Sequence, residues 1–261
     1  MTNGKVYLVG AGPGDPKLIT VYGMECIQQA DVILYDRLVN EELLKYAKAE
    51  AELIFCGKQP GKHQIIQNQI HQLLIEKASQ GKTVTRLKGG DPCIFGRVGE
   101  EAEILVEHGI HYEIVPGITA GIAAPAYAGI PVTHRDYAST FAIVTGHSRE
   151  EKDGDQLNWS ALAQGIDTIA FYMGIGNLPY IVSRLIENGK SPDTKAAIIQ
   201  WGTTAKQKTV TGSLKDIEVR VLEAGITHPA IVLVGDVVGL REKIRWFQEA
   251  EEKQLVGIGR I

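Results

Sequence analysis

Short apolar runs recur along the chain, most of them about five residues long and rich in Val and Ile. Gly, Asp or Pro closes most of them, a pattern typical of strands that are buried on both faces. The runs predict strands at Val6–Val9, Val32–Tyr35, Leu53–Cys56, Val84–Leu87, Tyr112–Val115, Phe141–Val144, Thr168–Tyr172, Ala196–Ile199 and Ile231–Val234.

Helical patterns lie between these runs. Ile66, Ile70, Leu73 and Leu74 have the spacing that places apolar side chains on one face of a helix, and Gly81 supplies a C-terminal stop. Strands that alternate with helices predict an α/β fold with a largely parallel sheet and helical crossovers.

The predicted strands are too many for a single sheet in a chain of 261 residues. The Ala- and Gly-rich stretch at 117–129 is a natural join, so we expect an N-terminal α/β domain at 1–116 and a C-terminal α/β domain at 117–248. Residues 249–261 read as a tail. Lys208–Gly212 has the character of an extended piece, which makes the second sheet mixed and leaves the first parallel.

The composition of the chain argues against several classes of protein. The chain is 22% charged and 44% hydrophobic with a net charge of -4, which is ordinary for a globular protein and argues against nucleic-acid binding. No apolar run approaches the roughly 20 residues that span a bilayer, and the N-terminus lacks a signal-peptide pattern, so we expect a soluble cytoplasmic protein. Cys26, Cys56 and Cys93 form no CxxC pair and read as small buried hydrophobes, not as a disulfide or metal framework.

The loop Gly10-Ala-Gly12-Pro-Gly14 follows the first predicted strand and resembles a dinucleotide-binding fingerprint. Asp15 stands where that fingerprint needs Gly, and Pro13 and Pro16 interrupt the helix that should begin there. An NAD site is therefore disfavoured. What remains is a Gly-rich loop at a strand end, where a ligand can approach the backbone closely.

Other loops at strand ends have the same character. Gly89-Gly90-Asp91 either makes a tight turn or admits a ligand, and Asp91 either caps the next segment or accepts hydrogen bonds from a ligand. Thr119 is a helix N-cap or a ligand contact, and Met173 is core filler or faces the crevice at the strand ends. Several such loops together predict a cofactor pocket.

Cations also gather in these loops. Most charged side chains are simply solvated, but a few charge-assisted hydrogen bonds, each contributing roughly 1.5–3 kcal/mol, suffice to hold a polyanion. Charge alone does not separate a poly-carboxylate from a phosphate ligand.

Taken in order, several strings resemble one family closely. They are VGAGPGDPKLIT, DVILYDRLV, the GK and GKH elements at 57–63, RLKGGDPCIFGR, VPGITAGIAAPAYAGIPVTHRD, TGH, FYMG and HPAIVLVGDVV. From about Val6 to Trp246 the chain is similar to the uroporphyrinogen-III C-methyltransferase family, within the wider class of tetrapyrrole methylases.

The resemblance implies two α/β domains with S-adenosylmethionine in the cleft between them, and a homodimer. It implies two methyl transfers to uroporphyrinogen III, at C2 and C7, through precorrin-1 to precorrin-2, with S-adenosylhomocysteine released. The product would serve sirohaem and cobalamin synthesis. No metal is implied, and the chain's length leaves no room for the additional domain of bifunctional sirohaem synthases.

The resemblance also assigns residues. It implies Asp36 as proton acceptor and Lys58 as proton donor. Implied cofactor contacts are Pro13, Gly89, Gly90, Asp91, Ile94, Thr119, Ala120, Met173, Gly202 and Ala230. Because the substrate carries eight carboxylates, we expect substrate contacts at Arg37, Arg86, Arg135, Lys62 and His63.

The chemistry fits these residues. A sulfonium methyl group is already activated, so the protein needs mainly to align it with the carbon nucleophile. Two departures from the family pattern stand out: Gln59 replaces a usual cation, and Val98 replaces a usual glycine. Both bear on substrate affinity more than on reaction type.

Two other functions remain open. One is a methylase of the same class that acts on a later corrin precursor. The other is a non-enzymatic α/β protein that binds a nucleotide or anion without turnover.

Overall fold

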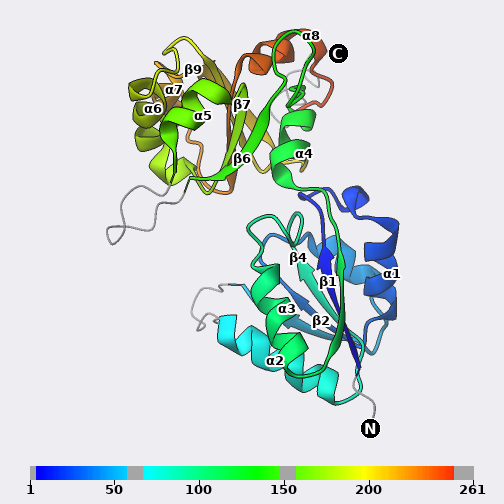
Figure 1. Ribbon diagram of the computed structural model, residues 1–261. Helices are drawn as coiled ribbons and strands as arrows, with labels where there is room; N and C mark the ends of the chain where they lie inside the picture. The colour runs from blue at the N-terminus through cyan, green and yellow to red at the C-terminus, as the bar shows by residue number, and fades with distance from the viewer. Residues whose placement is uncertain (1–3, 58–66, 147–156, 250–261) are drawn as a thin grey trace, which may run out of the picture. The chain divides into compact units, whose positions relative to one another are not determined.

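The chain forms two compact units, and the computed structural model describes residues 4–57, 67–146 and 157–249. Unit 1 comprises Met1–Thr119 and unit 2 comprises Ala120–Ile261 (Figure 1). This division falls a few residues beyond the expected boundary at 116. Each unit has its own sheet and its own hydrophobic clusters. Apart from Glu249, the expected tail lies outside the described residues.

Unit 1 is built on a parallel sheet with the strand order β3-β2-β4-β1-β5. Its strands are β1 (Lys5–Gly10), β2 (Val32–Tyr35), β3 (Glu52–Phe55), β4 (Val84–Lys88) and β5 (His111–Val115). Its helices are α1 (Val21–Gln29), α2 (Gln67–Ser79) and α3 (Val98–Glu107). Helices α2 and α3 pack on one face of the sheet and α1 on the other (Figure 1). Because the strands are parallel, their carboxyl ends share one edge, where open α/β sheets bind ligands.

Strand β4 occupies the middle of this sheet, and its side chains alternate between the two faces. Val84 packs with the residues of α2 and α3, whereas Leu87 packs with those of α1. The hydroxyl of Thr85 donates to the carbonyl oxygen of Cys26 in α1 at 2.9 Å. Arg86 and Lys88 share the face of Val84, so two cations point toward α2 and α3.

Unit 2 has a mixed sheet in the order β6-β7-β10-β8-β9. Its strands are β6 (Phe141–Thr145), β7 (Thr168–Tyr172), β8 (Lys195–Gln200), β9 (Lys208–Ser213) and β10 (Ala230–Val234). Strands β6 and β7 are parallel, and β10 runs antiparallel to β7 and β8. The extended piece expected at Lys208–Gly212 is β9, which pairs antiparallel with β8. The predicted fold class, two α/β units with one parallel and one mixed sheet, is confirmed.

Helices cover both faces of this second sheet. One face carries α5 (Trp159–Gly165), α6 (Leu178–Glu187) and α7 (Ile217–Glu223), and the other carries α4 (Ala120–Tyr127). The short helix α8 (Arg241–Ile244) follows the last strand. In the part of the chain that the structure describes, none of the helices has the length and apolar composition needed to cross a bilayer.

The predicted helix after the third strand is α2, which buries Ile70, Leu74 and Ala78 on its inner face. Ile66, the first residue of the predicted apolar face, lies outside the described residues. The chain leaves this helix through Gly81, whose φ of 78° is a left-handed conformation that glycine adopts without strain.

The cysteines divide into two kinds. Cys26 and Cys56 are buried, and burial raises the pKa of each thiol to about 11. Cys93 is exposed, contrary to the expectation that all three are core residues. It directly follows Asp91-Pro92 in a turn at the sheet edge, so the apolar neighbours in its sequence do not cover it.

Candidate functional site

Three loops of unit 1 meet at the carboxyl edge of its sheet. They follow β1, β4 and β5, which are neighbours in the strand order. The backbone N–H of Gly90 donates to the carbonyl of Gly12 at 2.7 Å, and the N–H of Gly12 donates to the carbonyl of Gly90 at 3.2 Å. Oδ2 of Asp91 accepts a hydrogen bond from the N–H of Gly117 at 2.9 Å. The three loops therefore form one connected backbone surface.

Glycine is required where these loops touch. A Cβ atom on Gly117 would lie 2.3 Å from the carbonyl oxygen of Gly90, and one on Gly10 would lie 2.6 Å from Cα of Gly117. Both contacts are with backbone, which cannot swing aside as a side chain can. The close approach is thus a fact of the structure, and the ligand contacts expected at Gly89 and Gly90 stay a prediction.

Asp91 takes up one of the two roles that the sequence left open, and its part in ligand binding stays a prediction. Besides the bond to Gly117, its Oδ1 accepts from the N–H of Cys93 at 2.8 Å, which is the capping arrangement of a turn. Asp91 therefore organises the edge of the sheet. Pro13 and Ile94 are half-buried in the loops after β1 and β4, and Thr119 is buried.

In unit 2, the residues with an expected cofactor role lie at one edge of the mixed sheet. Met173 directly follows β7, and Gly202 lies just beyond the end of β8. Strand β10 runs antiparallel to both, so its first residue, Ala230, lies beside their carboxyl ends. The N–H of Trp201 donates to the carbonyl of Pro229 at 3.2 Å and joins the two segments.

The start of α4 belongs to the same edge. Ala120 is the first residue of α4, and the backbone N–H of Gly121 bonds to the hydroxyl of Tyr172 at the end of β7. A Cβ atom on Gly202 would lie 2.4 Å from Cβ of Ala124, so the loop after β8 packs directly on this helix. The structure therefore brings together the expected cofactor residues of unit 2.

Left-handed backbone is concentrated in the loops that follow strands. Among the residues that the structure describes, five non-glycine residues have positive φ: Phe95 (54°), Arg97 (58°), Met173 (55°), Trp201 (48°) and Thr203 (69°). Such conformations cost on the order of 1–3 kcal/mol each and tend to cluster at functional sites. No local signal in the sequence marks these positions, because none of them is Gly or Asn.

Asp36 follows β2 at the edge where the loops of unit 1 meet. Its side chain is 34% exposed, and Oδ1 lies 2.5 Å from Nη2 of Arg86. The Arg86 side chain is only 2% exposed. A surface carboxylate is therefore held from below by a buried guanidinium.

Glu101 of α3 completes this arrangement. Nε of Arg86 donates to Oε1 of Glu101 at 3.2 Å, and Nζ of Lys88 lies 2.8 and 2.9 Å from its two carboxylate oxygens. Nε2 of Gln67 donates to Oε1 of Glu101 at 3.1 Å. Glu101 is fully buried, with an exposed fraction of 0%. The four charged side chains form one network with no net charge.

The pKa shifts follow from this network. Burial alone lowers the pKa of Arg86, but the charges of Asp36 and Glu101 outweigh it and raise the pKa. Burial alone raises the pKa of Glu101, and the charges of Arg86 and Lys88 outweigh it and lower the pKa. The pKa of Lys88 is lowered by burial and by Arg86, which Glu101 only partly offsets.

Arg86 was expected to bind substrate, and the structure gives it another place. Its guanidinium is buried beneath Asp36 and is committed to two carboxylates of the protein. The alternation of β4 is the physical reason, since it turns Arg86 toward α2 and α3. The sequence does carry a signal for the burial of Arg86. Arg86 and Lys88 lie two residues apart on a buried strand, and cations buried in this way require carboxylate partners.

Arg37 is exposed beside Asp36 and remains an accessible cation. A Cβ atom on Gly57 would lie 2.8 Å from Cβ of Arg37, so the beginning of the GK element lies against it. The rest of that element falls outside the described residues, which includes Lys58, Gln59, Lys62 and His63.

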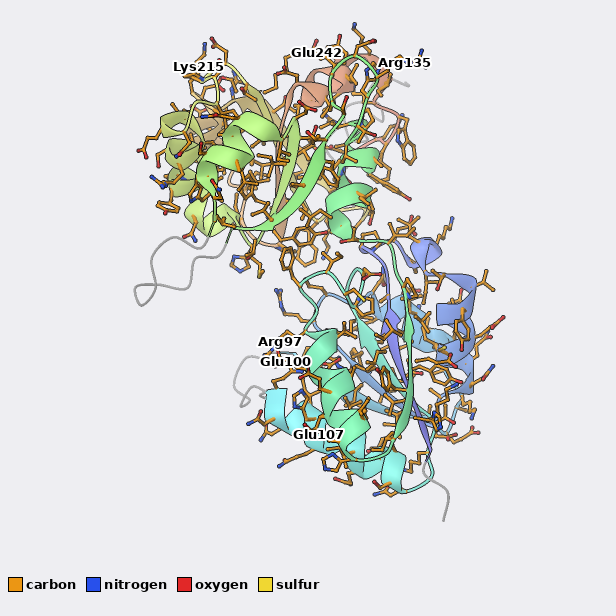
Figure 2. The ribbon with its side chains drawn as sticks, viewed as in Figure 1. Arg97, Glu100, Glu107, Arg135, Lys215 and Glu242 are labelled. Carbon is orange, nitrogen blue, oxygen red and sulfur yellow. The ribbon has the colours of Figure 1, made fainter. Side chains whose placement is uncertain are left out.

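Arg135 does not join the cofactor residues of unit 2. It is exposed in a loop that immediately precedes β6, closed by a bridge between His134 and Ala138. Met173 follows β7, which is parallel to β6, so the Arg135 loop enters the sheet from the opposite edge. Figure 2 labels Arg135 at the top of unit 2, at the same end of the view as the label of Glu242 in α8.

Val98, the departure from the usual glycine, has a clear structural role. It is the first residue of α3 and packs into the hydrophobic cluster beneath α2 and α3. The preceding Arg97 is exposed and forms an ion pair with Glu100, with Nη2 and Oε2 2.6 Å apart (Figure 2). The helix start thus accommodates the Val98 side chain.

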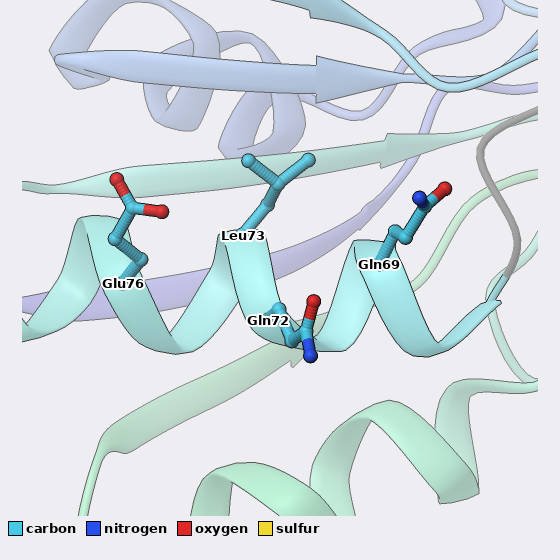
Figure 3. A pocket seen from close by; sticks show the side chains of 4 residues that line it. All are labelled: Gln69, Gln72, Leu73 and Glu76. Atoms are coloured by element: carbon cyan, nitrogen blue, oxygen red, sulfur yellow. The ribbon is translucent and has the colours of Figure 1, made fainter.

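A separate pocket lies along α2, lined by Gln69, Gln72, Leu73 and Glu76 (Figure 3). It contains none of the residues with an expected role. In the described part of the chain no group of three His, Cys, Asp or Glu side chains is arranged to hold a metal ion.

Comparison with known proteins decides the family. The model of the family described as Tetrapyrrole (Corrin/Porphyrin) Methylases matches residues 5–218. The chain belongs to the tetrapyrrole methylase family. The resemblance seen in the sequence motifs is thereby confirmed, and the loops at the sheet edges are those of a tetrapyrrole methylase.

Two relatives of this tetrapyrrole methylase are named uroporphyrinogen-III C-methyltransferase. The one from Priestia megaterium is 59% identical over 235 residues, which are 90% of this chain and 98% of that protein. The one from Bacillus subtilis (strain 168) is 54% identical over 257 residues, which are 98% of this chain and 52% of that protein. The chain thus spans about half the length of the latter relative.

Solved structures share the fold. Uroporphyrin-III C-methyl transferase from Thermus thermophilus, complexed with S-adenyl homocysteine, has a TM-score of 0.75 and 36% identity and covers 91% of this chain and 100% of that one. A cobalt precorrin-4 methyltransferase has a TM-score of 0.80 and 31% identity and covers 90% of this chain and 95% of that one.

Proposed function

We propose that this tetrapyrrole methylase transfers methyl groups from S-adenosylmethionine to uroporphyrinogen III. The transfers are to C2 and C7, through precorrin-1 to precorrin-2, for sirohaem and cobalamin synthesis. The observation that carries the proposal is 59% identity to a uroporphyrinogen-III C-methyltransferase along 98% of that protein's length. The grouping of the expected cofactor residues at one edge of each sheet supports it.

The edges described above fit S-adenosylmethionine. In unit 1, Gly10 and Gly117 have no room for a Cβ atom, so the three loops stay in backbone contact along this edge. The residues that would hold the cofactor are Pro13, Gly89, Gly90, Asp91, Ile94 and Thr119 in unit 1, and Ala120, Met173, Gly202 and Ala230 in unit 2. When bound, S-adenosylmethionine supplies a methyl group that is already activated by the positive sulfur.

Asp36 is the group we assign to proton acceptance. A pyrrole carbon that gains a methyl group leaves its ring positively charged, and the charge is relieved when a proton departs. The partly exposed carboxylate of Asp36 can stabilise this cation and then take the proton. Oδ1 of Asp36 already pairs with Arg86, so Oδ2 is the oxygen assigned to the proton. Lys58 is the assigned proton donor.

Arg37 is the substrate-binding cation that the observations support best. It is exposed next to Asp36, and Arg binds a carboxylate through two parallel hydrogen bonds. Lys62 and His63, which follow Gly57 in the sequence, are the other substrate contacts that the resemblance implies. The resemblance also implies Arg135, but its loop lies at the edge of unit 2 opposite Met173, so we leave Arg135 out of the proposed set. We further propose that the enzyme is a cytoplasmic homodimer.

One observation favours a second candidate, methylation of a later corrin precursor. The cobalt precorrin-4 methyltransferase shares the fold with a TM-score of 0.80. Its identity of 31% is well below the 59% of the relative from Priestia megaterium, so uroporphyrinogen III is the preferred substrate.

A substrate panel separates these functions. The purified protein is mixed with S-adenosylmethionine and either uroporphyrinogen III or a precorrin that already carries its first methyl groups, and initial rates are compared. Faster transfer to uroporphyrinogen III is expected. Transfer only to the later precursor would support the second candidate, and binding of S-adenosylmethionine without transfer to either would support a non-enzymatic binding protein.

A further inference from the structure

Two cations are buried on the middle strand of unit 1. Arg86 and Lys88 have exposed fractions of 2% and 4%, and both point from β4 toward α2 and α3. Removing an ammonium or guanidinium from water costs several kcal/mol even after the protein relaxes. Glu101, which has no exposed surface, is placed between them and offsets their charge.

The stability of the fold alone does not explain this buried ion network. Replacing a buried ion network by apolar side chains of similar volume is often neutral, or even stabilises the fold. The neighbours on this face of the sheet are already apolar and include Val84 and Leu34. The placement of the charges therefore calls for an explanation beyond packing.

The contacts run in one direction, from the interior to the surface. Lys88 and Gln67 hold the carboxylate of Glu101, and Glu101 accepts from Nε of Arg86. Nη1 of Arg86 also reaches the carbonyls of Leu34 and Leu87 at 3.4 and 3.5 Å. Because a guanidinium is planar, fixing Nε and Nη1 also fixes the direction of Nη2.

Nη2 is the nitrogen that pairs with Asp36, at 2.5 Å. Asp36 is one-third exposed, and it is the member of the network that reaches solvent. The other three charged side chains, Arg86, Lys88 and Glu101, are buried. The network thus terminates in a carboxylate at the edge of the sheet where the loops of unit 1 meet.

We propose that Arg86, oriented by Glu101 and Lys88, is a positioning residue that fixes the Asp36 carboxylate for its part in methyl transfer. The inference rests on the proposed function, since it gives Asp36 a reaction to serve. It replaces the substrate contact that the sequence suggested for Arg86. This role depends on the planar guanidinium of Arg86, which donates to Asp36 and Glu101 at the same time, and not on its positive charge alone.

The test is a double-mutant cycle of Arg86→Lys and Asp36→Ala in the full chain, assayed anaerobically with uroporphyrinogen III and S-adenosylmethionine. Arg86→Lys keeps the charge balance but cannot reach Asp36 and Glu101 together. Since misplaced reacting groups lose on the order of 100-fold, we expect kcat to fall about 100-fold with KM little changed. In the double variant kcat should equal that of Asp36→Ala, because both changes remove the same contribution.

Thr85→Val is the matched control. It removes a buried hydrogen bond from the adjacent position of β4, on the face away from Asp36. It should lower the melting temperature and leave kcat unchanged. If Arg86→Lys does not fold, Glu101→Gln takes its place in the cycle, because it keeps the side-chain shape and loosens Arg86 indirectly.

The outcomes are distinct. Full turnover by Arg86→Lys, losses that multiply in the double variant, or an equal loss of kcat in Thr85→Val would each overturn the inference. A wild-type protein that transfers no methyl group to uroporphyrinogen III would overturn the proposed function and the inference with it. A fall in kcat that the Asp36→Ala background abolishes would support the positioning role.

Discussion

The carboxylate of Asp91 and the backbone N–H of Gly117 are hydrogen-bonded at 2.9 Å, although they lie on loops that follow different strands. This bond joins the loop after β4 to the loop after β5. With the paired bonds between Gly12 and Gly90, it makes the carboxyl edge of unit 1 a single backbone framework. A ligand seated there would depend on how closely these loops approach each other.

Gly117→Ala should disrupt that framework. The added Cβ would meet the carbonyl oxygen of Gly90 at 2.3 Å and force the loops apart. We expect S-adenosylmethionine binding to weaken about tenfold or more, which corresponds to about 1.4 kcal/mol. Gly99→Ala is the matched control, because nothing lies within 4 Å of the new atom and the site is helical. Calorimetric titration measures both, and equal affinities would contradict the assignment.

Asp36→Asn should remove most turnover and leave cofactor binding intact. The amide retains the size of the side chain and an oxygen for Arg86, but it cannot accept a proton at neutral pH. Loss of a general base typically costs about 10²- to 10⁴-fold in rate, so kcat should fall by that order. Titration of the variant with S-adenosylmethionine measures whether cofactor binding is retained. An Asn variant with wild-type kcat would remove the proton-acceptor role.

Glu101 should make folding stability sensitive to acid. Burial raises its pKa, but the charges of Arg86 and Lys88 outweigh burial and hold the pKa below its ordinary value of 4.5. At pH values above about 4.5, the ionised Glu101 stabilises the folded protein fully. As the pH falls from about 4.5 to the lower pKa that Glu101 has in the folded protein, the unfolded chain binds more protons than the folded one. The free energy of unfolding therefore decreases as the pH falls.

Glu101→Gln cannot titrate, and its unfolding free energy should decline less on acidification than that of the wild type. Urea unfolding across this acidic range measures the difference. Glu100→Gln is the neighbouring control: Glu100 is an exposed partner of Arg97, and solvent screens such pairs. Parallel pH profiles for wild type and Glu101→Gln would show that the buried carboxylate does not supply the acid sensitivity.

Thiol accessibility gives a simple check on the fold of unit 1. Cys93 is exposed, whereas Cys26 and Cys56 are buried with pKa values raised by burial to about 11. A chromogenic disulfide reagent should therefore modify Cys93 in the native protein and the other two only after unfolding. Cys93→Ser should abolish the native reaction. Rapid modification of all three thiols in the native protein would contradict the packing of α1 and β3.

The sequence predicts the sheets well because buried strands leave a strong local pattern. Two of them, Val32–Tyr35 and Thr168–Tyr172, end where the apolar runs end, and Lys208–Gly212 correctly indicates the mixed second sheet. Strand order is less accessible, since it depends on pairings between distant segments. The neighbour relation of β4 to both β1 and β2 is such a case.

The positions of individual side chains are harder to predict from the sequence than the strands are. Arg86 reads as a surface cation until the alternation of β4 is combined with the position of Glu101 in α3. Arg135 sits in a motif that resembles the family, yet its loop enters the sheet at the edge opposite Met173. The left-handed backbone at Met173 and Trp201 is imposed by the surrounding structure, so no local residue preference marks it.

The most direct test of the account is the mass of the product formed under anaerobic conditions, because porphyrinogens oxidise readily in air. Purified protein is incubated with uroporphyrinogen III and S-adenosylmethionine carrying a labelled methyl group. We expect a product heavier than the substrate by two labelled methyl groups. Unchanged uroporphyrinogen III, in a sample that still binds S-adenosylmethionine, would contradict it.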